Sequence, residues 1–248
     1  MNMLTLDLIR RKIVHGMLRV FAPGARLSYS QFGEDLILEY LFSQLNIKTP
    51  TYLDIGANDP RNCSNTYKFY QKGSKGILVE PNPVLANLLS RIRPRDTVLN
   101  IGVGFHNGVV DSDYYLFPAW ASGLNTFSKE HANYWETIGH KDFGKIKIEK
   151  VLSVKLNSVN DILRQHFKDG SPNFISLDVE GLDLSILQSI NFDVCTTEVI
   201  CVETMDYDDD QKTLKINEII DFLKTKSYMV FADTRVNTIF CKTHLFNT

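Results

Sequence analysis

Residues 52–59 read Tyr-Leu-Asp-Ile-Gly-Ala-Asn-Asp, a short run that is apolar except for Asp54, stops at a glycine and continues into polar residues. A run of this kind is typical of a strand that is buried on both faces. Gly56 allows the backbone to turn sharply and to approach a ligand closely. The stretch therefore predicts the first strand of an open α/β sheet, with a ligand site just beyond its carboxyl end.

Outward from this strand, apolar strand-like runs alternate with helical runs. The expected further strands cover residues 76–79, 97–103, 173–177, 198–202, 228–232 and 238–241. The expected helices cover residues 35–45, 65–71, 83–92, 182–189 and 216–226. This alternation indicates a mostly parallel sheet with helices on both faces, and the last two strand runs indicate a C-terminal antiparallel hairpin.

Composition narrows the class of protein further. The chain has 248 residues, a net charge of −2, 44% hydrophobic and 23% charged residues, which are ordinary values for a globular protein. Near-neutral charge argues against a dedicated nucleic-acid binder, so no nucleic-acid partner is expected. No segment approaches about 18 consecutive apolar residues, so no transmembrane helix is expected.

Two regions depart from the regular alternation. Residues 1–27 predict an amphipathic helix with a basic face and a connector, and this helix suits either a homodimer contact or a peripheral membrane contact. The remaining residues, 28–248, form the expected main domain, with an irregular aromatic-rich insertion near 109–150. The aromatic side chains of the insertion could form its own small core or stack against a sugar. No signal peptide is recognised, so a cytoplasmic location is expected.

Acidic residues stand where the first two strands end. Asp54 and Asp59 flank the Gly56 turn, and two carboxylates there would repel a dinucleotide pyrophosphate but suit a cationic ligand. Glu80 ends the second strand, where an acid can accept hydrogen bonds from both ribose hydroxyls. Asn100 follows the third strand, and the sequence leaves two interpretations open for it: a contact with the cofactor or a simple turn residue.

A second group of acids follows two later strands. Asp178 and Glu180 stand at one expected strand tip, and Glu203 ends the next strand. Neighbouring strands lie about 5 Å apart, so these carboxyls are expected to converge. They could act as a general base, bind substrate or cofactor, or hold Mg²⁺. His131, within the insertion, is a second candidate base.

Six motifs occur in order between about residues 28 and 204: Ser30–Asp35, Leu53–Asn58, Val79–Pro83, Leu124–Thr126, Leu177–Gly181 and Val202–Glu203. Together they resemble the FkbM family of methyltransferases. The resemblance implies a Rossmann-like class I methyltransferase fold, in which a mostly parallel seven-stranded sheet carries the C-terminal hairpin. It also implies S-adenosylmethionine-dependent methylation, usually of a sugar, glycan or polyketide-like hydroxyl, and so suggests polysaccharide biosynthesis.

The resemblance implies cofactor positions at Asp54, Gly56 and Glu80 and active-site acids at Asp178 and Glu180, and the other candidates below are expected from their places at the strand ends, in the motifs or in the insertion. The expected cofactor-binding residues are Gln31, Asp54, Gly56, Asn58, Glu80, Asn82, Asn100 and Asp178. The expected catalytic residues are Asp178, Glu180, Glu203 and His131, and the first three are also the candidate Mg²⁺ ligands. Gln31 belongs to a motif for which the sequence suggests only a lid or wall over the cofactor.

Three other functions stay open from the sequence. An NAD-linked Rossmann enzyme would share Glu80, but the chain lacks the GxGxxG turn of such sites. A methyltransferase-like scaffold without catalysis would not need the acids that this chain retains. N-methylation is a rival within the leading class, because no motif specifies the acceptor.

Overall fold

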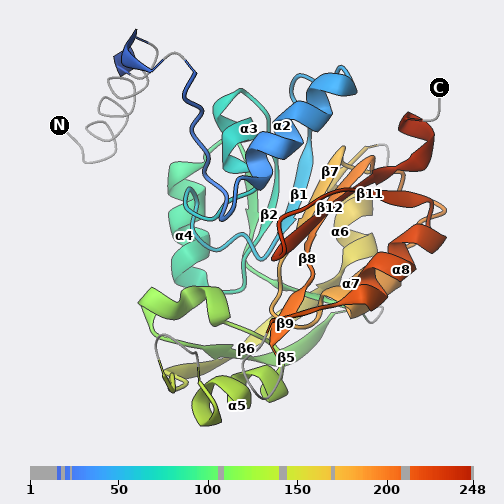
Figure 1. Cartoon of the computed structure of the whole chain (residues 1–248). Coiled ribbons are helices and arrows are strands. Elements are labelled where there is room, and N and C mark those ends of the chain that lie inside the picture. Colours follow the sequence, from blue (N-terminus) through green and yellow to red (C-terminus); the bar gives the residue numbers. More distant parts are fainter. Residues whose placement is uncertain are drawn as a thin grey trace.

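The computed structural model describes residues 16–17, 20–22, 24–105, 109–139, 144–168, 171–207 and 213–246 (Figure 1). Most of the predicted N-terminal helix within residues 1–27 lies outside these residues. The helices are α2 (Glu34–Gln44), α3 (Tyr67–Gln71), α4 (Pro83–Ile92), α5 (Lys129–Thr137), α6 (Val159–His166), α7 (Asp183–Ser189) and α8 (Asn217–Thr225), with 3₁₀ turns η1 (Ala119–Leu124) and η2 (Thr243–Leu245). No described helix is long and apolar enough to cross a membrane.

Seven strands form one large sheet in the order β11-β12-β8-β7-β1-β2-β3. Their bounds are β1 (Tyr52–Ile55), β2 (Gly76–Val79), β3 (Thr97–Leu99), β7 (Phe174–Leu177), β8 (Val199–Glu203), β11 (Tyr228–Asp233) and β12 (Asn237–Lys242). The first five pair in parallel, whereas β12 runs antiparallel to both β8 and β11. The predicted seven-stranded α/β fold with a C-terminal hairpin is confirmed.

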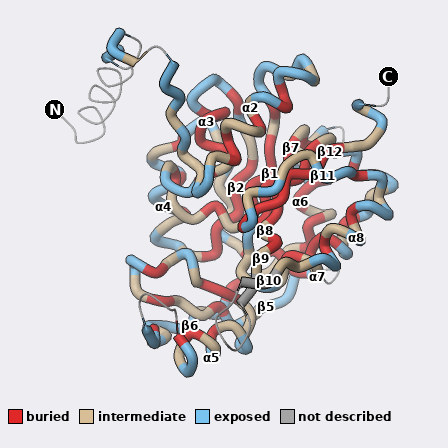
Figure 2. Tube along the Cα trace, in the orientation of Figure 1, coloured by how far each residue is buried: buried red, intermediate tan, exposed pale blue. Residues whose placement is uncertain are grey.

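The two faces of the large sheet bury alternate residues of each strand. Leu53 and Ile55 pack in a cluster with side chains of α6, α7 and α8, whereas Tyr52 packs with side chains of α2, α3 and α4. The central strands are accordingly buried along their length (Figure 2). Burial on both faces explains why these strands read as continuous apolar runs.

The insertion is more regular than the sequence predicted. Its strands β4 (Gly102–Gly104), β5 (Val110–Leu116) and β6 (Lys150–Ser158) form a second sheet in the order β4-β6-β5. The predicted strand 97–103 was therefore wrong as one element, because it is divided between β3 of the large sheet and β4 of the small one. A third, two-stranded sheet pairs β9 (Met205–Tyr207) with β10 (Thr213–Lys215).

Aromatic residues of the insertion build a small core of their own, as one of the two alternatives predicted. Phe117 and Trp135 are buried together with Ala132 and Ile146 in a cluster separate from the large sheet. The small sheet and α5 lie together at one end of the molecule (Figure 1). The insertion is thus a folded cap, and its packing can hold side chains in fixed positions beside the large sheet.

A buried ionic network lies beneath β1. Arg93 is completely buried, and its Nε donates to Asp96 Oδ2 at 2.7 Å. Its Nη2 donates to the Tyr52 hydroxyl at 3.0 Å and to Thr66 Oγ1 at 2.9 Å. Thr66 Oγ1 in turn donates to Asp54 Oδ2 at 2.5 Å. One arginine therefore connects the end of α4 to the acid at the end of β1.

Replacing Arg93 with methionine should lower the free energy of unfolding by about 3 kcal/mol, because a buried carboxylate loses its partner. Urea unfolding monitored by circular dichroism would measure the change. Arg91→Met, at an exposed position of the same helix, is the matched control and should change stability by about 0.5 kcal/mol or less. Equal effects of the two substitutions would contradict a structural role for the network.

Candidate active site

A cavity of about 430 Å³ lies at the carboxyl ends of β1, β2, β7 and β8, against the insertion. Its volume is within the range of small-molecule sites. The side facing the large sheet includes Asp54, Gly56, Glu80, Asp178 and Glu203. The opposite side, from the insertion, includes Tyr114, Leu124, Asn125, Phe127 and Trp135. The cavity is therefore at the predicted edge of the sheet, with the insertion as its second wall.

Gly56 shapes the turn after β1. It adopts a left-handed φ of +85°, and an added Cβ would lie 1.8 Å from the carbonyl oxygen of Asp178. Its backbone N–H donates to the Val79 carbonyl at 3.0 Å. No other residue type would allow β1 and β7 to approach so closely here. Gly56 also lines the cavity, so this turn is part of the cavity wall.

Glu80 is 2% exposed and lies at the end of β2. Its Oε2 accepts a hydrogen bond from the Asn58 N–H, and its Oε1 accepts one from the Asn82 N–H, both at 2.8 Å. Burial raises the pKa of Glu80 to about 7, although the two N–H groups oppose that shift. Each oxygen keeps a further lone pair, so the carboxylate can still accept hydrogen bonds from a ribose.

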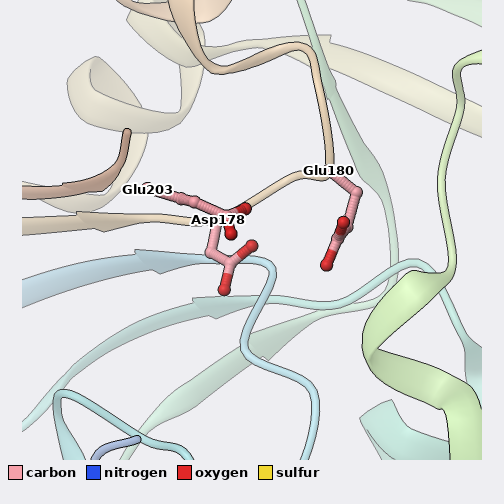
Figure 3. Close-up of side chains that lie close together, drawn as sticks. All are labelled: Asp178, Glu180 and Glu203. Atoms are coloured by element: carbon pink, nitrogen blue, oxygen red, sulfur yellow. The ribbon is translucent and has the colours of Figure 1, made fainter. Parts of the chain in front are cut away.

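Three acids meet at the tips of β7 and β8. Asp178, Glu180 and Glu203 each have one carboxylate oxygen within 4.8 Å of the others. Figure 3 shows the Asp178 and Glu203 side chains next to each other, with Glu180 across from them. The loss of water around the carboxyl raises the pKa of Asp178 to about 6. Burial, followed by the charge of Asp178, raises the pKa of Glu203 well above its usual range.

The loop that carries Glu180 has an uncommon backbone. Glu180 adopts φ +55° and Gly181 adopts φ +96°, so two successive residues are left-handed. The Glu180 carbonyl accepts a hydrogen bond from Thr126 Oγ1 at 3.0 Å, and Asp183 Oδ1 accepts one from the Val179 N–H at 3.3 Å. Left-handed conformations of non-glycine residues cost free energy and persist where the surroundings fix them. The Asp183 contact fixes the loop internally, and the Thr126 contact fixes Glu180 against the insertion.

Most of the predicted site residues converge on this cavity. Those that line it are Gln31, Asp54, Gly56, Asn58, Glu80, Asp178, Glu180 and Glu203. Asn82, Asn100 and His131 are not among the lining residues. Asn82 caps α4, Asn100 donates to the carbonyls of Glu80 and Pro81 at 2.9 Å, and His131 packs against Gly181. These three residues support the backbone around the site, and their predicted contacts with ligands stay predictions.

Sequence reasoning assigned no role to several residues that shape the cavity. Tyr114 and Asn125 line it from the insertion, and Thr66 and Arg93 support Asp54 from behind. Asn125 belongs to the Leu124–Thr126 motif, which was a usable signal. Thr66 and Arg93 belong to none of the motifs, because their role depends on contacts that only the folded chain creates.

The chemistry of the cavity suits S-adenosylmethionine. The Gly56 turn lines the cavity, and Glu80 is the acid that can accept hydrogen bonds from a ribose. The described residues that line the cavity include six acids, Asp54, Asp59, Glu80, Asp178, Glu180 and Glu203, and no lysine, arginine or histidine. An anionic pyrophosphate would be repelled there, whereas an ammonium and a sulfonium would be attracted.

Comparisons with known proteins give one family match and several structural neighbours. The family model described as "Methyltransferase FkbM domain" matches residues 54–230. Among solved structures, a TehB-like SAM-dependent methyltransferase from Corynebacterium glutamicum is 8% identical, with a TM-score of 0.41, over 95% of this chain and 99% of that chain. A Burkholderia thailandensis 1,6-didemethyltoxoflavin-N1-methyltransferase is 12% identical, with a TM-score of 0.42, over 96% and 89%. No curated protein matches the chain.

The fold and the site define an S-adenosylmethionine-dependent methyltransferase. The match covers more than half of the chain, so the protein belongs to the FkbM methyltransferase family. Membership excludes the NAD-linked enzyme as the main interpretation and leaves the acceptor as the open part of the function.

Proposed function

We propose that the protein methylates a hydroxyl oxygen of a sugar or glycan, with Asp178 and Glu203 assisting as a pair of adjacent acids. The observation that carries the proposal is the adjacency of these two carboxyls at the cavity edge opposite the insertion. A hydroxyl is a poor nucleophile at neutral pH and reacts faster when a base accepts its proton. An amine acceptor that is already unprotonated has less need of such a base.

S-adenosylmethionine supplies an electrophilic methyl group on a sulfonium sulfur, so the protein mainly needs to align it with the acceptor. Glu80 and the Gly56 turn hold one side of that alignment. The acceptor hydroxyl lies beside Asp178 and Glu203, which share a proton because two adjacent carboxylates repel each other. As the oxygen bonds to the methyl carbon, the bond from that carbon to the sulfonium sulfur breaks, S-adenosylhomocysteine leaves as the neutral thioether, and the hydroxyl proton passes to the ionised member of the pair.

Mg²⁺ is a second use for the same acids. Oxygen ligands suit Mg²⁺, and an ion beside the acceptor would lower the pKa of its hydroxyl. The three carboxylate oxygens lie within 4.8 Å of one another, which is wider than the roughly 4.2 Å that opposite ligands of one Mg²⁺ span. Binding of Mg²⁺ would therefore draw the carboxylates together. Addition of EDTA to the methylation assay described next distinguishes a role of these acids as metal ligands from a role as proton acceptors.

The proposal predicts methyl transfer to oxygen by the purified protein. Labelled S-adenosylmethionine would be incubated with a panel of glycosides and amino sugars, and the methylated atom identified by NMR. Asp178→Asn should lower the rate about 100-fold, within the usual effect of a general base, while S-adenosylhomocysteine still binds. Asp193→Asn, at an exposed position, is the control. Methylation of nitrogen alone, or an unchanged rate in Asp178→Asn, would contradict the proposal.

A further inference from the structure

The insertion presents a mixed apolar and polar wall to the acids. Leu124, Phe127 and Trp135 line the cavity there, and the rings of Tyr114 and Phe127 lie 4.5 Å apart between centroids. Aromatic faces of this kind pack against the apolar face of a ring-shaped ligand. The wall is fastened at both ends, because Ser122 Oγ donates to Asn58 Oδ1 at 3.1 Å and Thr126 Oγ1 donates to the Glu180 carbonyl.

Asn125 lies between these two anchors and is 7% exposed. Its Oδ1 accepts a hydrogen bond from the Phe117 N–H at 2.8 Å, which fixes the orientation of the amide. Its Nδ2 has no hydrogen-bond partner among the described residues, although the amide lies close enough to the Tyr114 hydroxyl to oppose the raised pKa of that group. A buried amide N–H without a hydrogen-bond partner lowers the stability of the fold, and a ligand oxygen that accepts from it removes that cost.

The charge of the cavity limits which ligand can accept a hydrogen bond from Asn125 Nδ2. The described lining of the cavity holds six acids and no cationic side chain. Arg93 lies behind Asp54 and is paired with Asp96, so it does not offset the acids at the tips of β7 and β8. A phosphate or carboxylate on the acceptor side of the cavity, beside Asp178, Glu180 and Glu203, meets like charges without a counter-ion from the described lining, which is strongly unfavourable.

We propose that the insertion side of the cavity binds the methyl acceptor, and that this acceptor is an uncharged hydroxyl compound with an apolar face. Asn125 Nδ2 donates a hydrogen bond to an oxygen of this compound. Phosphorylated or carboxylated compounds are rejected from this subsite. The inference rests on the proposed hydroxyl methylation, because it places the acceptor between Asn125 and the Asp178–Glu203 pair. It adds a specificity-determining residue and an electrostatic filter to that reaction.

The test uses saturation-transfer NMR on the full chain with S-adenosylhomocysteine bound. Three probes share a glucose ring: methyl β-D-glucopyranoside, methyl β-D-glucuronide and glucose 6-phosphate. The neutral glycoside should bind saturably, and the two anions should bind at least about 10-fold more weakly, given the cost of like charges. Calorimetry with S-adenosylhomocysteine on the same samples checks the cofactor side independently.

Asn125→Asp is the decisive variant. It keeps the oxygen that accepts from Phe117 and removes the amide donor, so binding of the neutral glycoside should fall about 10-fold. Affinity for S-adenosylhomocysteine should stay within about twofold, because the change is on the acceptor side. Asn87→Asp adds the same charge at an exposed position of α4 and should change neither. Asn125→Ala, with its thermal unfolding compared to the wild type, provides a second variant if Asn125→Asp does not fold.

Three results would overturn the inference. The first is that the two anions bind as tightly as the neutral glycoside. The second is that Asn125→Asp weakens the binding of S-adenosylhomocysteine as much as the binding of the glycoside, and the third is that no probe binds while S-adenosylhomocysteine is bound. Failure of the wild-type protein to bind S-adenosylhomocysteine would instead contradict the cofactor assignment on which the proposed function depends. The two failures are thereby distinguished.

Discussion

Gly56→Ala should abolish measurable cofactor binding. The new Cβ would lie 1.8 Å from the Asp178 carbonyl oxygen, a backbone atom that cannot rotate away. The φ of +85° adds a penalty of about 1–2 kcal/mol for a residue with a Cβ. The turn after β1 and the end of β7 must therefore separate, and both carry residues of the site. We expect a loss of affinity for S-adenosylhomocysteine of about 1000-fold and a loss of stability of about 4 kcal/mol.

Gly73→Ala provides a close control for this effect. Gly73 is also left-handed, at φ +101°, but an added Cβ would meet no atom within 4 Å. That variant should lose only about 1–2 kcal/mol of stability, from the backbone conformation alone, and should bind the cofactor normally. Calorimetry and urea unfolding of both variants separate the two contributions. Cofactor binding by Gly56→Ala at wild-type affinity would show that the turn is not part of the site.

The sequence predicted the large sheet because its strands are buried on both faces. Runs such as 76–79 and 173–177 stand out as apolar, and parallel topology then places Asp54, Glu80 and Asp178 at one edge. The small sheet was missed for the opposite reason. β5 reads Val-Asp-Ser-Asp-Tyr-Tyr-Leu and is mostly exposed or half-buried, so its pattern is too weak to separate a strand from a loop.

The site was predictable only where chemistry follows chain position. Acids that end strands could be placed, whereas Tyr114 reaches the cavity from an insertion whose path over the sheet has no local signal. Asn125, in the same insertion, had its motif as a signal, but the motif does not show where the residue lies in the fold. Arg93 was hidden for a similar reason, since its partners Tyr52 and Thr66 are distant in sequence and meet it only in the fold. Contacts of this kind depend on tertiary packing that no single stretch of sequence encodes.

Asp183 is expected to make the stability of the protein depend on pH. It is the first residue of α7, is 4% exposed and is not among the cavity-lining residues. Burial, followed by the charge of Asp178, raises the pKa of Asp183 to about 7 from its ordinary value of 3.8. A carboxyl with a raised pKa in the folded state binds its proton more tightly there than in the unfolded chain. Its ionisation therefore destabilises the fold.

The sign of the pH effect follows from these two pKa values. Below about pH 4, Asp183 is protonated in both the folded and the unfolded state and does not change the stability. Between about pH 4 and 7, the free energy of unfolding falls by about 1.4 kcal/mol per pH unit. Above about pH 7, the full cost of about 4 kcal/mol is present.

Asp183→Asn keeps the oxygen that accepts from the Val179 N–H but cannot ionise. It should stabilise the protein at pH 8 by up to about 4 kcal/mol, less the cost of any unpaired amide N–H, and the advantage should vanish near pH 4. Urea unfolding between pH 4 and 8, with the exposed Asp193→Asn as control, measures the difference, and a pH-independent gap between wild type and Asp183→Asn would contradict it.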